Sequence, residues 1–72
     1  MNLTQLRPGE AASVLAVEPS PLAARLIDLG FLGQVRCIAA AGRGGMRAYL
    51  VGGALIALRH SDALTVRVCR LD

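Results

Sequence analysis

The chain has 72 residues, of which 54% are hydrophobic, and it carries a net charge of +3 at neutral pH. Its longest uncharged stretch, residues 48–58, is too short for the roughly 20 apolar residues of a membrane-spanning helix, and the first residues lack the basic-then-apolar order of a secretory signal. The basic residues are all arginines, dispersed along the chain with only two aromatic residues for stacking, so a nucleic-acid partner is not expected.

The first predicted elements are a turn and a strand. Pro8–Gly9 predicts a type II turn, because proline presets the φ angle at the second turn position and glycine accepts a positive φ at the third. Residues 10–18 follow, with the β-branched Val14 and Val17 and no helix cap. This segment is predicted to be the first strand.

A short amphipathic helix is predicted between Ser20 and Gly30. Ser20 can cap the N-terminus by accepting from free backbone N–H groups, Pro21 suits the first turn, and Gly30 suits the helix end. Three leucines recur at the spacing of one helix face: Leu22, Leu26 and Leu29. Because so short a helix is marginally stable alone, this face is expected to pack on the rest of the protein. Arg25 and Asp28 lie off the face and can form an ion pair.

The remainder of the chain is predicted to be strands. They cover residues 35–41, 46–51, 54–58 and 64–71, and apolar and polar residues alternate in the last one. Gly52–Gly53 predicts a two-residue hairpin turn. The glycines at 42, 44 and 45 predict a flexible turn, and His60–Ser61–Asp62 predicts a break before the last strand.

These elements predict a single, mostly β domain over residues 1–72: a small five-stranded barrel with one short helix after the first strand. Closure of the barrel would remove exposed sheet edges, and the helix would plug an open end or cover a seam. Cys37 and Cys69 are predicted to be free thiols that act as small core residues, because disulfide-rich domains of this size carry more cysteines.

Four sequence blocks carry a family resemblance. They are Leu3-x-x-Leu6-x-x-Gly9, Arg25-Leu26-x-Asp28-Leu29-Gly30-Phe31, Val51-x-Gly53-x-x-Ile56-Ala57-Leu58-Arg59 and Asp62-Ala63-x-x-Val66-x-Val68. In this order they resemble the FeoA domain, the small SH3-like barrel of bacterial ferrous iron transport systems. The resemblance implies a cytoplasmic accessory protein that binds and modulates FeoB, the membrane permease with a GTPase domain. Residues 32–34 depart from the family, because the loop there is shorter and lacks the usual proline.

The sequence gives little support to catalysis, so no catalytic residue, cofactor or metal ligand is assigned. His60, Ser61 and Asp62 are adjacent, whereas the members of a catalytic triad come from separated segments. Cys37, Cys69 and His60 are too few and too scattered for a metal site. The glycines at 42–45 lack the helix and the Lys–Ser/Thr pair of a phosphate loop, so a turn is the favoured interpretation.

Partner binding is therefore the predicted mode of action. The candidate docking residues are Arg25, Asp28, Phe31 and Leu32, with the strands around Tyr49 as a second region, because exposed apolar residues beside arginine suit the centre of an interface. The alternative for Phe31 is that it fills the barrel end. The alternative function is an SH3-like structural or metal-responsive regulatory module that acts through self-association, as a homo-oligomer, or through another protein partner.

Overall fold

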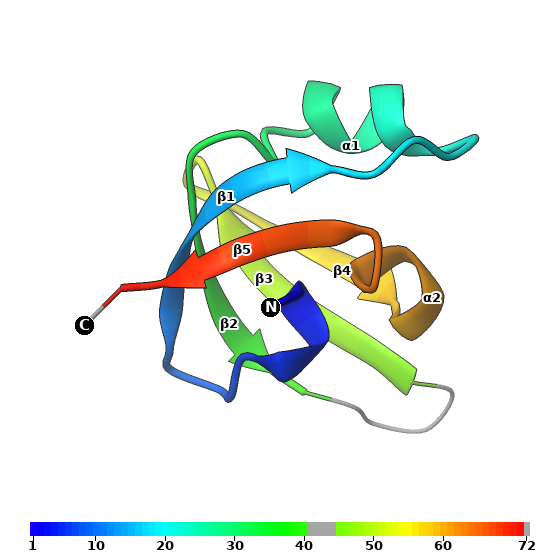
Figure 1. Ribbon diagram of the computed structural model, residues 1–72. Coiled ribbons are helices and arrows are strands. Elements are labelled where there is room, and N and C mark those ends of the chain that lie inside the picture. Colours follow the sequence, from blue (N-terminus) through cyan, green and yellow to red (C-terminus); the bar gives the residue numbers. More distant parts are fainter. Residues whose placement is uncertain (41–44, 72) are drawn as a thin grey trace.

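A five-stranded antiparallel sheet, strongly curled, forms most of the structure (Figure 1). The structure is a computed structural model that describes residues 1–40 and 45–71. Its strands are β1 (Ala11–Val17), β2 (Gln34–Ala39), β3 (Met46–Val51), β4 (Ala54–Arg59) and β5 (Val66–Arg70), and its helical elements are η1 (Leu3–Gln5), α1 (Ala23–Asp28) and α2 (His60–Ala63). The strand order is β4-β3-β2-β1-β5. The predicted mostly β architecture with a short helix after the first strand is confirmed.

Two of the predicted turns form as their glycines indicate. Gly9 has a φ of 91°, and the N–H of Glu10 donates to the carbonyl of Arg7 at 3.0 Å, which closes the turn around Pro8. Gly52 and Gly53 have φ values of 56° and 83°, the positive pair of a type I′ hairpin. The turn predicted at residues 42–45 falls mainly on residues 41–44, which lie outside the described residues.

The helix α1 is shorter than the predicted segment from Ser20 to Leu29. The Oγ of Ser20 accepts from the N–H of Leu22 at 3.3 Å, and the carbonyl of Ser20 accepts from Ala23 at 3.1 Å. The Ser20 side chain thus accepts from a free backbone N–H as predicted, but this bond closes a turn before the helix, whose N-cap position is Leu22 and carries no side-chain bond.

Only the middle of the predicted leucine face enters the core. Leu26 is 2% exposed, Leu22 is half-buried and Leu29 is 39% exposed. The expectation that the whole face packs is wrong for Leu29, which is the C-cap residue just beyond α1, a helix at the rim of the curled sheet (Figure 1). Leu29 instead lines a groove that is described below.

The predicted polar break at residues 60–62 is the one-turn helix α2. The N–H of Leu64 donates to the carbonyl of His60 at 3.1 Å, and Ala63 is fully buried. Because Leu64 is the C-cap of this helix, the last strand begins at Val66, later than predicted.

The core lies inside the curled sheet and draws on every strand. Its buried hydrophobic residues are Leu3, Leu6, Ala12, Leu26, Phe31, Val35, Cys37, Tyr49, Val51, Leu58, Ala63, Val66 and Val68. Cys37 and Cys69 are both free. Cys37 belongs to the core as predicted, and its burial raises the pKa of the thiol. The prediction is wrong for Cys69, which is exposed because the alternation of β5 places it on the outer face.

The sheet does not close, so the predicted removal of both edges is only partly achieved. β4 and β5 stand at opposite ends of the strand order. The outer edge of β5 is covered, because the N–H of Val68 donates to the carbonyl of Met1 at 2.8 Å and Asn2 forms a bridge with Arg67. In the described parts of the chain, the backbone of β4 has hydrogen-bonded partners only in β3.

Candidate functional site

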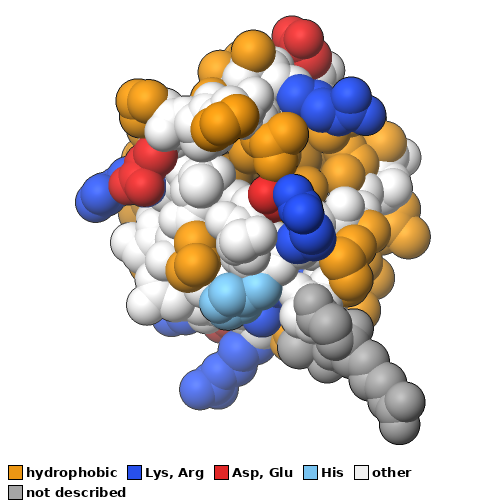
Figure 2. All heavy atoms as spheres, turned by 90° about the vertical axis from the view of Figure 1, so that its right-hand side faces the viewer, with side chains coloured by type: hydrophobic (Ala, Val, Ile, Leu, Met, Phe, Trp, Pro, Cys, Tyr) orange, Lys and Arg blue, Asp and Glu red, His pale blue; other side chains and the backbone are white. Residues whose placement is uncertain are grey.

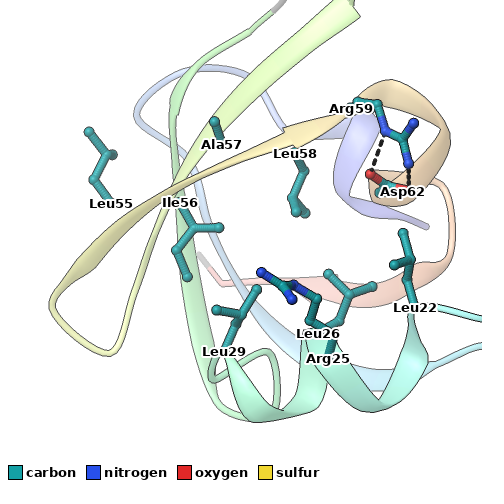
Figure 3. A pocket seen from close by; sticks show the side chains of 10 residues that line it. All are labelled: Leu22, Arg25, Leu26, Leu29, Leu55, Ile56, Ala57, Leu58, Arg59 and Asp62. Carbon is teal, nitrogen blue, oxygen red and sulfur yellow. Dashed lines mark hydrogen bonds and ion pairs between the residues drawn. The ribbon is translucent and has the colours of Figure 1, made fainter.

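A groove of about 480 Å³ runs between α1 and the open strand β4 (Figure 3). Its floor and walls are mostly aliphatic, and charged side chains stand at its rim. The lining residues are Leu22, Arg25, Leu26, Leu29, Leu55, Ile56, Ala57, Leu58, Arg59 and Asp62. Seven of the ten lining residues are aliphatic and three are charged, so the groove offers both apolar and polar surface, and a concavity of this size is a candidate binding site.

The two walls of the groove have different origins. Short α1 spans the rim of the sheet and turns Leu26 inward, while Leu22 and Leu29 border the space on either side of it (Figure 3). The opposite wall is β4, whose alternation directs Ile56 and Leu58 toward the helix (Figure 3). The groove is thus the part of the barrel seam that the helix does not fill.

The charges at the groove leave one arginine without an acidic partner. Arg59 donates to Asp62 through Nε at 3.1 Å and through Nη2 at 3.4 Å, an exposed fork of two bonds. Arg25 extends from α1 into the groove (Figure 3) and forms no ion pair among the described residues. The predicted Arg25–Asp28 pair is therefore not formed, and the groove lining carries a net positive charge.

The predicted docking residues do not form one surface. Arg25, Asp28 and Leu32 are exposed, and Arg25 alone among them lines the groove. Phe31 and Tyr49 are both fully buried, so their assignment as exposed docking residues is wrong. Phe31 belongs to the buried core, which agrees with the alternative that the sequence left open, in which it fills the barrel and does not face a partner.

Tyr49 is buried because its hydroxyl group is satisfied inside the protein. It accepts from the Nε of Arg47 at 2.9 Å and donates to the carbonyl of Leu3 at 3.1 Å. Burial raises the pKa of the phenol, although the hydrogen bond from Arg47 acts in the opposite direction. Tyr49 therefore anchors the N-terminal segment to β3 and does not belong to a binding surface.

A second apolar surface lies on the outer face of β3 and β4. Leu50 stands opposite Leu55 across the two strands, and Leu55 is 65% exposed. Met46 is exposed on the same face of β3. Hydrophobic side chains also gather beside arginine side chains on the face seen in Figure 2. Strand β4 thus has apolar residues on both of its faces next to its open edge.

The sequence contained a signal for this surface that the docking prediction did not use. Residues 54–58 are five consecutive apolar residues, and such a run is typical of a strand covered on both faces. In this structure one face of β4 is open and the other borders the groove. A strand with this pattern at a sheet edge is a candidate contact surface.

Among residues 1–40 and 45–71, no three His, Cys, Asp or Glu side chains gather into a possible metal site. No helix within those same ranges has the length and apolar character needed to cross a membrane.

Comparison with known proteins identifies a family that matches this chain. A family model described as the FeoA domain matches residues 1–70. The chain is similar to the FeoA protein of Stenotrophomonas maltophilia, an SH3 domain protein solved in complex with zinc, at 34% identity and a TM-score of 0.83, over 96% of this chain and 89% of that one. It is also similar to FeoA from Chlorobium tepidum, at 28% identity and a TM-score of 0.89, over 100% and 71% of the two chains.

A third solved structure of similar fold is iron(II) transport protein A from Clostridium thermocellum. It shares 30% identity with a TM-score of 0.84, over 94% of this chain and 44% of that one. No curated protein matches the chain. These likenesses confirm the SH3-like fold predicted from the sequence.

Proposed function

The chain belongs to the FeoA family, which serves bacterial ferrous iron transport, and we propose that it acts in the cytoplasm by binding the FeoB GTPase-permease and modulating iron uptake. On this proposal the protein acts by binding and catalyses no reaction itself. Iron is the cargo of the permease and not a cofactor of this chain.

The observation that carries the proposal is the aliphatic groove between α1 and β4, with Arg25 at its rim. The outer face beside it exposes Leu50 and Leu55. Apolar surface that stays in contact with water in so small a domain favours association with another protein. Apolar residues next to arginine also match the composition of interface centres.

A capture experiment tests the proposal. The tagged protein is mixed with full-length permease from the same organism in lipid nanodiscs, with GTP, with GDP and without nucleotide. We expect specific capture and a change in GTP hydrolysis or in iron flux when the protein is present. The control is a heat-unfolded sample of the same protein. Absence of capture in all three nucleotide conditions would overturn the proposal.

A further inference from the structure

Strand β4 offers an unpaired backbone edge. In a two-residue hairpin, the residues that flank the turn form a hydrogen-bonded pair, and such pairs then alternate with non-bonded ones. In the β3–β4 register this alternation turns the N–H and C=O groups of Leu55 and Ala57 away from β3. Such an edge is a template for another strand.

The other edge of the sheet is not available in the same way. Met1 and Asn2 lie along β5, where Met1 accepts a hydrogen bond from Val68. Among residues 1–40 and 45–71, the chain thus covers the β5 edge with its own N-terminal residues and places no backbone partner along the β4 edge. The difference singles out β4 as the place where a partner can extend the sheet.

The surroundings of the β4 edge suit a strand with apolar side chains. On the inner side lies the groove, where Ile56 and Leu29 offer aliphatic surface. On the outer side, Leu55 and Leu50 form an exposed cross-strand pair. Because the side chains of an added strand alternate between these two sides, every second residue would enter the groove.

The charge of the groove distinguishes between two possible binding partners, a second copy of this chain and a segment of another protein. Asp62 is already bonded to Arg59, which leaves Arg25 to attract a carboxylate. A second copy of the chain would bring its own β4, which contains no acidic residue and would add another Arg59. A foreign segment that carries an Asp or Glu therefore complements the groove better than self-association does.

We propose that β4 binds an extended segment of the partner protein as an added strand, with an apolar side chain in the α1–β4 groove and a carboxylate on Arg25. This inference rests on the proposed function for the identity of the partner, which is the full-length permease. It goes further in naming the surface, the backbone conformation and the side-chain chemistry of the segment.

Amide hydrogen exchange tests the backbone part directly. The ¹⁵N-labelled protein is exchanged in D₂O with and without nanodisc-embedded permease, then dissociated and read by NMR. We expect the amides of Leu55 and Ala57 to gain about tenfold or more protection in the complex, because they become hydrogen-bonded. Unchanged exchange at both amides, in a complex that does form, would overturn the inference and leave the proposed function standing.

Matched variants test the side-chain part. Arg25→Glu and Leu55→Glu should each weaken permease binding about tenfold or more. Their controls are Arg7→Glu and Leu15→Glu, at exposed positions away from the groove, with Leu15 67% and Leu55 65% exposed. The controls should bind as the unmodified protein does. Equal binding by all four variants would overturn the inference.

A proline variant separates strand addition from ordinary side-chain docking. Ala57→Pro removes an N–H that points away from β3, a change that edge strands tolerate, and it should abolish the added strand. If this variant fails to fold, protection of the Leu55 amide in the exchange experiment on the unmodified protein distinguishes strand addition from side-chain docking. Protection that appears at high protein concentration without permease would assign the edge to a second copy and overturn the inference. If the unmodified protein fails to bind the permease, both the proposed function and the assignment of a permease segment to the β4 edge are overturned.

Discussion

The guanidinium of Arg47 donates through Nε to the phenolic oxygen of Tyr49 at 2.9 Å, on the inner face of β3. Its Nη2 donates to the carbonyl groups of Thr4 and Leu6 at 2.8 and 3.1 Å. A buried cation is thus held by neutral acceptors of the N-terminal segment, and that segment is fixed to a strand some forty residues later in the chain. Burial of the charged group is tolerated here because its Nε and Nη2 donors are hydrogen-bonded and the residue keeps 8% exposure.

The first prediction removes one atom from this network. Tyr49→Phe leaves the Nε of Arg47 without its acceptor in a buried position, so we expect the free energy of unfolding to fall by about 1–3 kcal/mol. Urea unfolding followed by circular dichroism measures the change. The control Ser61→Ala removes an exposed hydroxyl and should alter stability by less than about 0.5 kcal/mol. Equal midpoints for the two variants would contradict the prediction.

The second prediction concerns the aromatic core residue Phe31. Phe31 is fully buried, whereas its neighbour Leu32 is 63% exposed. Phe31→Ala should lower stability by about 3–5 kcal/mol, a large fraction of the roughly 5–15 kcal/mol by which domains are stable. Leu32→Ala should change it by less than about 0.5 kcal/mol. Thermal melting compares the two, and a stable Phe31→Ala protein would show that the site can collapse.

A third prediction compares two glycines of the loop after α1. Gly30 has a φ of 106°, and a Cβ there would lie 3.2 Å from the Cγ1 of Val51. Gly30→Ala should therefore cost about 1–3 kcal/mol. Gly33 has no positive φ and no atom near its Cβ position, so Gly33→Ala should leave stability unchanged or raise it slightly. Chemical denaturation of both variants provides the measurement, and the reverse order of stability would disprove the assignment of strain to Gly30.

The fourth prediction is a loss of stability at alkaline pH. Burial raises the pKa of both Cys37 and Tyr49, so the folded protein retains protons that the unfolded chain releases. Stability is then fully present below the unfolded pKa of the thiol, about 8.5, and declines as pH rises through the folded values. Urea midpoints between about pH 7 and about pH 10 should show the decline.

Substitution of Cys37 shows how much of the alkaline loss of stability comes from its thiol. A Cys69→Ser background prevents disulfides between exposed thiols. In that background, Cys37→Ala should make the decline of stability with rising pH less steep near the unfolded pKa of the thiol. An unchanged slope would mean that the thiol does not contribute.

The local elements were predictable because their signals depend on neighbouring residues. Gly52–Gly53 defines a hairpin whatever the rest of the fold does, and the strand bounds at residues 46–51 agree with β3. The family resemblance likewise rests on short blocks at fixed spacing, and the match over residues 1–70 confirms it.

Burial and edge status were not predictable because they depend on where distant segments meet. Phe31 follows a helix end in the sequence, and nothing local indicates that its side chain is fully buried in the core. The partner of the Tyr49 hydroxyl is the Leu3 carbonyl, far away in the sequence. The groove is likewise made by α1 and β4, and no spacing rule relates Arg25 to Asp62.

The pairing of β1 with β5 has a consequence for protein synthesis. Val14 lies opposite Val68 and Val17 lies opposite Val66, so the first strand of the chain completes its pairing only with the last. A nascent chain that has emerged only through β4 exposes one side of β1 and lacks two core valines, Val66 and Val68. Cooperative folding therefore waits until β5 has left the ribosome, and a chain stalled before that point presents an aggregation-prone strand.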